Sequence, residues 1–254
     1  MTLSDQQLDR YARHIVLRDI GGAGQSKLLS SHVLLIGAGG IGCPAIQYLA
    51  AAGVGTISVV DDDTVALSNL QRQILYSDHD IGTAKVEAAG AAAARLNPDI
   101  TFNAIAQRIG KDTSADMLAG VDVVIDGSDN FTTRLIVNDL CLAAKVPLVS
   151  AAIGRFHGQI GTFTGWQADA PCYRCFVGDA HDPDDCDDCA TQGVLGAMCG
   201  LMGSFAAMEA IRALTGFGEP QQGKLQLFDG LTPSMRSIKL PKDPACSSCS
   251  GLSA

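Results

Sequence analysis

The chain has 254 residues, of which 47% are hydrophobic and 18% are charged, and its acidic excess gives a formal net charge of −9. This composition can form a large core and is unlike that of a disordered chain. Net acidity argues against a protein that coats nucleic acid or an anionic membrane, because both attract concentrated positive charge. The charged first twenty residues lack the apolar core of a signal peptide, so we expect a cytoplasmic protein without a membrane partner.

Apolar runs alternate with helix-period segments in the first part of the chain. The run His32–Ile36 is followed at once by glycines and predicts a buried parallel strand. Further strands are expected over 56–60, 121–125 and 147–151, and helices over 41–52, 83–96 and 132–144. This alternation predicts an α/β fold, a Rossmann-like doubly wound parallel sheet.

The pattern changes beyond residue 154. Strands are expected over 158–165, 224–228 and 235–240, with one long helix over 194–215, so antiparallel strands should continue the sheet. The polar segment 171–190 predicts an exposed loop. The uncharged stretch 191–208 has the length of a membrane span, but it lacks an aromatic belt and a basic flank. We therefore expect a core helix, with apolar positions that include Met198, Leu201, Met202, Phe205, Met208 and Ile211.

A glycine-rich turn follows the first strand and opens a helix, as a dinucleotide-binding fingerprint requires. Its glycines are Gly37, Gly39, Gly40 and Gly42, and Asp61 ends the next strand. Glycines let the backbone approach a phosphate, and a helix N-terminus offers free N–H groups. Taken alone, this pattern indicates an NAD-dependent oxidoreductase, which stays open as an alternative of another class.

Charged residues near the same edge of the sheet indicate a triphosphate instead. Asp129 and Asn130 follow the strand expected over 121–125, and Arg72 and Lys85 follow Asp61 along the chain. A carboxylate beside phosphates needs a cation between them, and nucleoside triphosphate sites use Mg²⁺ held by one or two carboxylates. The alternatives are a helix cap for Asp129 and ordinary surface charge for the two cations.

Three cysteine pairs share the spacing Cys-x-x-Cys: Cys172/Cys175, Cys186/Cys189 and Cys246/Cys249. Two such pairs form a tetrahedral thiolate site for Zn²⁺. Spacing alone favours the first two pairs, because only ten residues separate them. Free buried thiols are the alternative.

Several motifs occur together in one order: 10–14 (RYARH), 37–42 (GAGGIG), 68–73 (SNLQRQ), 129–130 (DN) and 171–175 (PCYRC). With them, the chain resembles the bacterial relatives of ubiquitin-activating enzymes, the adenylyltransferases of molybdopterin and thiamine biosynthesis, from about residue 4 to Cys249. The resemblance implies an enzyme that uses ATP and Mg²⁺ to adenylate the C-terminal glycine of a ubiquitin-like sulfur-carrier protein ending in Gly-Gly, releasing pyrophosphate. It also implies a homodimer, and a separate sulfur donor such as a cysteine desulfurase or a rhodanese-like protein. We expect the molybdopterin-synthase type, with the thiamine-pathway enzyme as the alternative.

The resemblance also assigns residues. It places a nucleotide-binding half at about 30–152 and a carrier-binding and zinc half at about 153–250 of a single domain spanning 1–254. The nucleotide and Mg²⁺ residues would be Gly37, Gly39, Gly40, Gly42, Asp61, Ser68, Asn69, Arg72, Lys85, Asp129 and Asn130, with Arg13 supplied to the partner subunit. It points to Cys172, Cys175, Cys246 and Cys249 as the zinc ligands that staple the fold. Cys189 matches a cysteine that links covalently to the carrier in thiamine-type members, while Cys186 leaves open a disulfide or a second metal site.

Overall fold

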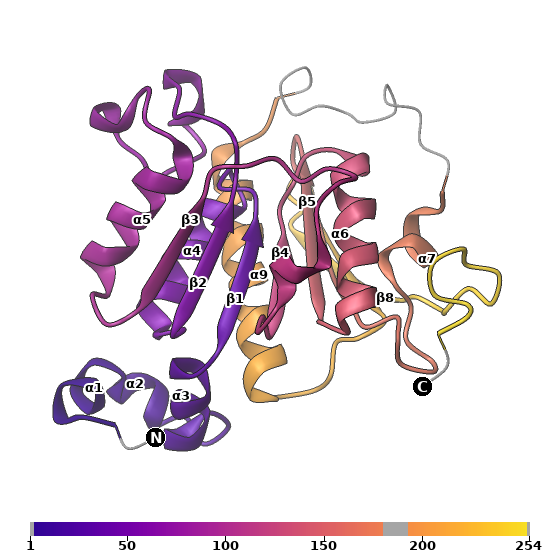
Figure 1. The fold of residues 1–254 in the computed structure, drawn as a ribbon, viewed down its shortest axis with the longest axis horizontal. Helices are drawn as coiled ribbons and strands as arrows, with labels where there is room; N and C mark the ends of the chain where they lie inside the picture. The colour runs from indigo at the N-terminus through magenta and orange to yellow at the C-terminus, as the bar shows by residue number, and fades with distance from the viewer. Residues whose placement is uncertain (1–2, 180–192, 253–254) are drawn as a thin grey trace.

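The computed structural model describes residues 3–179 and 193–252, and all eight strands in that part of the chain form one sheet (Figure 1). The strand order is β3-β2-β1-β4-β5-β6-β7-β8. Strands β3 to β5 in this order run parallel, and β5 to β8 run antiparallel. The predicted fold class is therefore confirmed. The strands are β1 (His32–Ile36), β2 (Thr56–Val60), β3 (Thr101–Ile105), β4 (Val123–Asp126), β5 (Leu148–Gly154), β6 (His157–Phe163), β7 (Lys224–Asp229) and β8 (Ser234–Lys239).

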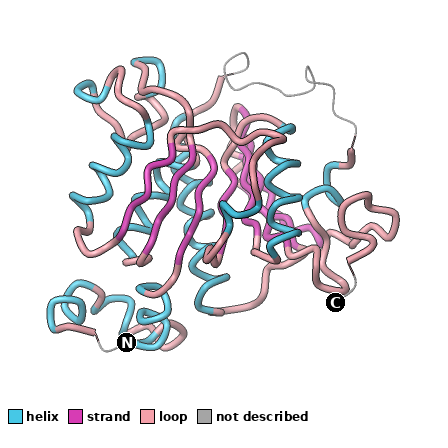
Figure 2. Tube along the Cα trace, in the orientation of Figure 1, coloured by secondary structure: helices cyan, strands magenta, loops and turns pink. Residues whose placement is uncertain are grey.

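Helices cover both faces of the sheet (Figure 2). One hydrophobic cluster joins the sheet to α4, α5 and α9, and a second joins the opposite face to α6 and α7. Helices α1 to α3 lie at the end of the sheet where β1 begins (Figure 1). The helices are α1 (Asp5–Arg10), α2 (Ala12–Ile15), α3 (Gly21–Leu29), α4 (Gly42–Ala52), α5 (Lys85–Leu96), α6 (Phe131–Ala144), α7 (Tyr173–Val177) and α9 (Gly196–Thr215).

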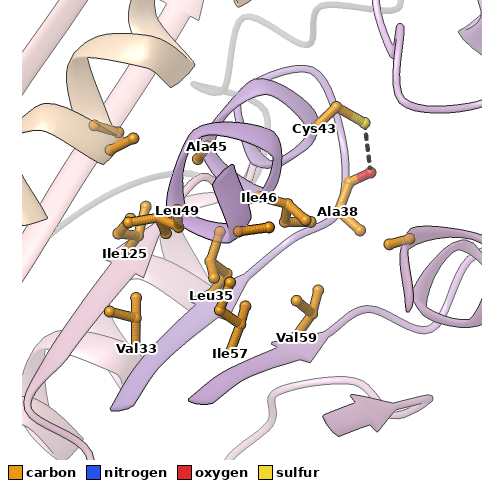
Figure 3. Packing of buried hydrophobic residues seen from close by; sticks show 14 of the residues in the cluster. Val33, Leu35, Ala38, Cys43, Ala45, Ile46, Leu49, Ile57, Val59 and Ile125 are labelled. Carbon is orange, nitrogen blue, oxygen red and sulfur yellow. Dashed lines mark hydrogen bonds between the residues drawn. The ribbon is translucent and has the colours of Figure 1, made fainter. Parts of the chain in front are cut away.

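A cluster of buried hydrophobic side chains lies between α4 and the sheet (Figure 3). Leu35 of β1, Val59 of β2 and Ile125 of β4 pack with Ile46 and Leu49 of α4, and each of these side chains is at most 1% exposed. Parallel strands covered on both faces are apolar along their whole length, which is why the run that forms β1 was recognisable in the sequence. This packing holds the end of β1 and the start of α4 in fixed positions.

Helix α9 is long and apolar enough to cross a membrane, and it is the one such helix among the described residues. Half of the most apolar 18-residue stretch of α9 is buried in the protein, and the helix packs against α4, β5 and β6. The expected core helix is therefore confirmed, but its predicted apolar face is too wide. Leu201 and Met208 are 40% and 42% exposed, because they lie on the side of the helix turned away from the sheet.

Two other expectations are wrong. No strand was expected over Thr101–Ile105, yet β3 forms one edge of the sheet; its polar, half-exposed residues give no clear alternation. The segment 171–190 is not wholly an exposed loop, because α7 lies within it and Tyr173 is only 3% exposed. Tyr173 is buried by edge-to-face contacts with Phe163 and Phe176, which sequence polarity does not reveal.

Candidate functional site

A cavity of about 560 Å³ lies at the carboxyl ends of β1, β2 and β4. Parallel strands bring their carboxyl ends to one edge of the sheet, where ligands bind in folds of this class. The structure brings most of the predicted nucleotide residues to this cavity. Its lining includes Gly37, Gly39, Gly40, Asp61, Asn69, Arg72, Lys85, Asp129 and Asn130.

The glycine turn is shaped by contacts that exclude side chains. Gly37 has a φ of +93°, a conformation that favours glycine. A Cβ on Gly42 would lie 2.0 Å from the Gly37 carbonyl oxygen, so the turn closes tightly against the first residue of α4. A Cβ on Gly40 would lie 2.6 Å from Cys199 Sγ of α9. The backbone therefore runs close along the cavity wall.

Side chains fix both backbone polar groups of Ala38 inside this turn. Asp61 Oδ2 accepts the Ala38 N–H at 2.7 Å, and Tyr76 Oη donates to the Ala38 carbonyl at 2.8 Å. Cys43 Sγ donates to the same carbonyl at 3.4 Å (Figure 3). Burial raises the pKa of the Cys43 thiol to about 12 and raises the pKa of Tyr76, so both groups stay neutral donors at physiological pH.

Among the described residues, the cavity lining includes four cations, of which Arg72 and Lys85 are the two that the sequence predicted. Arg72 donates to the Ser68 carbonyl at 2.9 Å and to Asn69 Oδ1 at 3.2 Å. Lys85 is buried, and its Nζ lies 2.7 Å from Asp63 Oδ2. The Lys85 side chain is 6% exposed, whereas that of Asp63 is 67% exposed. The cavity therefore contains a buried cation whose present counter-ion is a solvent-exposed carboxylate.

The turn after β4 separates the roles of Asp129 and Asn130. Asn130 Oδ1 accepts the Thr133 N–H at 2.8 Å and caps α6. Asp129 is exposed on the cavity wall, and the only side-chain hydrogen bond that it makes within the described part of the chain is a long one, 3.4 Å, from Asn130 Nδ2. The helix-cap role weighed for Asp129 therefore belongs to its neighbour, and the carboxylate of Asp129 faces the cavity.

Arg134 holds the turn after β4 in place, and the sequence analysis did not identify it. The buried Arg134 guanidinium donates to the carbonyl of Ser128, to Ser150 Oγ at 3.2 Å and to the Ala151 carbonyl at 3.0 Å. It thereby joins the turn after β4 to β5. No motif marks this arginine; its place in the first turn of α6, close behind Asp129, was the available signal.

Other lining residues that the sequence analysis did not identify include Asp63, Gln73, Arg108 and Tyr173. Gln73 is buried, and its Oε1 has no hydrogen-bond partner within the described part of the chain. An unpartnered buried acceptor on a cavity wall fits a ligand that donates a hydrogen bond. Gln73 stands inside the motif 68–73, which was the signal that could have identified it.

Several predicted residues lie elsewhere. Gly42 and Ser68 are not part of the cavity lining. Gly42 packs against the Gly37 carbonyl, and the Ser68 carbonyl accepts a hydrogen bond from Arg72. Arg13, on α2, is exposed and does not line the cavity of its own chain. Cys186 and Cys189 fall outside the described residues.

Four cysteines form a second site, where α7 and the C-terminal segment meet beside α6. The sulfurs of Cys172, Cys175, Cys246 and Cys249 all lie within 4.8 Å of one another. The Sγ–Sγ distances are 3.9 Å between Cys172 and Cys175, 3.6 Å between Cys172 and Cys246, and 3.4 Å between Cys175 and Cys249. Tetrahedral Zn–S bonds of about 2.3 Å would place neighbouring sulfurs about 3.8 Å apart. The cluster therefore matches a tetrahedral thiolate site in both composition and spacing, and it unites the first and last pairs.

Comparisons with known proteins agree with this geometry. The chain is 45% identical over 249 residues to the SAMP-activating enzyme E1 of Haloferax volcanii, covering 98% of this chain and 91% of that protein. The chain is 44% identical over 247 residues to the molybdopterin-synthase adenylyltransferase of Escherichia coli, covering 97% of this chain and 98% of that protein. It is also 44% identical over 253 residues to the sulfur carrier protein ThiS adenylyltransferase of the same organism (99% of each).

The solved structure of E. coli MccB with ATP has the same fold, with a TM-score of 0.79, 24% identity, and 95% of this chain and 74% of that chain covered. The ThiF family model matches residues 11–248. A family model that covers nearly the whole chain, together with relatives above 40% identity, places the protein in the ThiF family.

Proposed function

We propose that this protein is an ATP-dependent adenylyltransferase that joins AMP to the C-terminal glycine carboxylate of a ubiquitin-like sulfur-carrier protein. The observation that carries the proposal is one cavity whose lining brings together the glycine turn, the cations Arg72 and Lys85, and the exposed carboxylate of Asp129. Two relatives of the chain are named adenylyltransferases, which supports the same chemistry. Nucleotide binding is assigned to about residues 30–152, and carrier and metal binding to about 153–250.

The reaction brings two anions together. A carrier carboxylate oxygen forms a bond to the α-phosphorus of ATP, and the bond from that phosphorus to the bridging oxygen of pyrophosphate breaks. Arg72 and Lys85 offset the repulsion and stabilise charge on the leaving pyrophosphate. No general base is needed, because a terminal carboxylate is already ionised at neutral pH. The glycine turn and Asp61 hold the adenosine side, and Gln73 Oε1 accepts a ligand N–H.

The donor set on the cavity wall fits Mg²⁺. Magnesium prefers oxygen ligands and commonly binds through one or two carboxylates plus substrate phosphates. Asp129 offers a carboxylate with only a long hydrogen bond to Asn130. When bound, the ion supplies charge neutralisation at the phosphates. Asp129 holds the ion, and Arg134 keeps the turn that bears Asp129 in place.

The four-cysteine cluster fits Zn²⁺ in a structural role. All four protein ligands are sulfurs, and sites with four protein ligands leave no open position for chemistry. Because the pairs lie 74 residues apart in the chain, the metal ties the C-terminal segment to α7.

The protein acts as a homodimer in this proposal. Arg13 is exposed and stands beside Val16 and Leu17, which are 71% and 52% exposed. Burial of these apolar side chains against a second copy would carry Arg13 to the partner's ATP. Sulfur comes from a separate donor, a cysteine desulfurase or a rhodanese-like protein, and the need for ATP and a carrier places the protein in the cytoplasm. Cys189 remains the candidate for a covalent link to the carrier.

Pyrophosphate exchange into ATP tests the proposal. The purified chain is assayed alone, with a molybdopterin-synthase small subunit and with a thiamine sulfur carrier. Exchange that requires one of these carriers supports the proposal, and we expect the molybdopterin type to be preferred over the thiamine type. Absence of exchange with every Gly-Gly carrier, together with tight NADH binding, would refute it in favour of an oxidoreductase.

Asp129→Ala should abolish exchange, whereas Asp116→Ala, at an exposed position outside the cavity lining, should not change it. Full activity of Asp129→Ala would remove the magnesium assignment.

A further inference from the structure

One arginine connects the two cysteine pairs that form the four-cysteine cluster. Arg174 lies between Cys172 and Cys175, and its Nε donates to Ser248 Oγ at 2.7 Å. Ser248 lies between Cys246 and Cys249. The residues inside the two Cys-x-x-Cys turns are therefore bonded to each other directly, independently of any metal.

The same arginine also reaches α6 and Asp179, which lies two residues beyond the end of α7. One terminal nitrogen donates to Asp139 Oδ2 of α6 at 2.8 Å, and the other donates to Asp179 Oδ1 at 2.6 Å. Ser248 Oγ donates in turn to Asp139 Oδ1 at 2.8 Å. Arg174, Ser248 and Asp139 thus form a closed triangle in which each side chain bonds both of the others.

This triangle is held more rigidly than a surface ion pair. The Arg174 side chain is only 14% exposed, and all three of its guanidinium nitrogens are engaged by side chains. A planar guanidinium holds its partners in one rigid arrangement of donors, whereas the donors of a lysine ammonium rotate freely. The arrangement therefore constrains the two turns that carry the four sulfurs.

We propose that Arg174 is a positioning residue of the metal centre, locking both Cys-x-x-Cys turns in the geometry that retains the ion. This inference rests on the proposed metal site. Groups outside the ligand set orient the ligands of metal sites, and their loss typically costs about 10–100-fold in metal affinity. The positive charge of Arg174 also lies beside a centre whose four thiolates and divalent ion carry a net negative charge.

Metal release from the full-length protein tests the inference. Zinc transfer to excess chelator is followed with a coloured indicator at a temperature where every variant is folded by circular dichroism. Arg174→Met should release zinc about 10–100-fold faster than the wild type. Arg174→Lys should release zinc at a rate between those of the wild type and Arg174→Met, because lysine keeps the positive charge but lacks the planar guanidinium. Arg236→Met, on the exposed strand β8, should release zinc at the wild-type rate.

A spectroscopic readout separates a positioning role from general destabilisation. In the Co²⁺-substituted protein, the visible bands of a tetrahedral thiolate site should shift or weaken in Arg174→Met while the folded baseline is kept. If Arg174→Met does not fold, Ser248→Ala and Asp139→Asn carry the same test, since each removes one corner of the triangle.

The outcomes distinguish the two proposals. A wild-type protein that holds zinc, with variants that release it within twofold of the wild-type rate and keep its Co²⁺ spectrum, would overturn the role of Arg174 alone. A wild-type protein that contains no zinc and takes up no Co²⁺ would overturn both this role and the metal site. Neither result would touch the adenylyltransferase proposal, which pyrophosphate exchange tests separately.

Discussion

Neutralising Asp63 should make the cavity bind ATP more tightly. Lys85 Nζ lies 2.7 Å from Asp63 Oδ2, so a phosphate that engages Lys85 competes with this carboxylate. Asp63 is 67% exposed, so the dielectric constant of water is appropriate, and two unit charges at this distance attract by about 1.5 kcal/mol. That free energy corresponds to roughly tenfold in affinity. We therefore expect Asp63→Asn to lower the Kd for ATP by up to about tenfold at low salt.

The assay is calorimetric titration of ATP into each variant in the presence of magnesium, at low and at physiological ionic strength. Asp62→Asn is the matched control, because Asp62 lines the same cavity but makes no side-chain hydrogen bond or ion pair among the described residues. It reports the general effect of removing one negative charge near the phosphates. The gain of Asp63→Asn should exceed that of the control and shrink as salt screens the pair.

A double-mutant cycle with Lys85→Met isolates the mechanism. If Asp63 acts by occupying Lys85, then Asp63→Asn should change ATP affinity no more than the control does once Lys85 is absent. Weaker ATP binding by Asp63→Asn would refute the reasoning and would indicate that Asp63 itself contacts the magnesium ion.

Three further changes test the stability of the glycine turn and of strand β1. Gly42→Ala should lower the unfolding free energy in urea by about 1–3 kcal/mol despite the higher helix propensity of alanine, because its Cβ would lie 2.0 Å from the Gly37 carbonyl oxygen; a stabilised variant would contradict the geometry of the turn. Tyr76→Phe should cost about 0.5–1.5 kcal/mol in the same assay, because it removes the shorter of the two hydrogen bonds to the buried Ala38 carbonyl and leaves only the weak thiol donor of Cys43; an unchanged urea midpoint would show that the bond contributes nothing. Burial lowers the pKa of His32 below 6.5, so the unfolded chain takes up this proton first and stability should fall as the pH drops below about 6.5. In His32→Gln the stability should depend less on pH in this window, and an identical pH profile would exclude the contribution of His32.

Local patterns in the sequence were sufficient for the glycine turn and the carboxylates around it. Gly37 follows an apolar run, and Asp61 and Asp129 follow two others. Because parallel strands end at the same edge of a sheet, recognising the strands also predicts that these residues converge. The convergence of Arg72 and Lys85 on the cavity depended on the family motifs rather than on any periodicity.

The spacing of the cysteines along the chain does not identify which pairs form the four-cysteine cluster. Short separation favoured pairing Cys172 and Cys175 with the cysteines at 186 and 189, whereas the family resemblance pointed to Cys246 and Cys249. The structure joins the pairs that lie 74 residues apart, because α7 and the C-terminal segment meet beside α6. Chain distance carries no information about such a contact.

The sequence by itself therefore determined the class of the fold, the order of most elements and the chemistry gathered at the carboxyl edge of the sheet, since each depends on residues close together in the chain. Only the tertiary structure decided which side chains support that chemistry. Arg134 beneath the turn of Asp129, Asp63 on Lys85, and Arg174 between the cysteine pairs all act through partners on other segments. Their contacts form when helices pack on the sheet, and no local pattern encodes them.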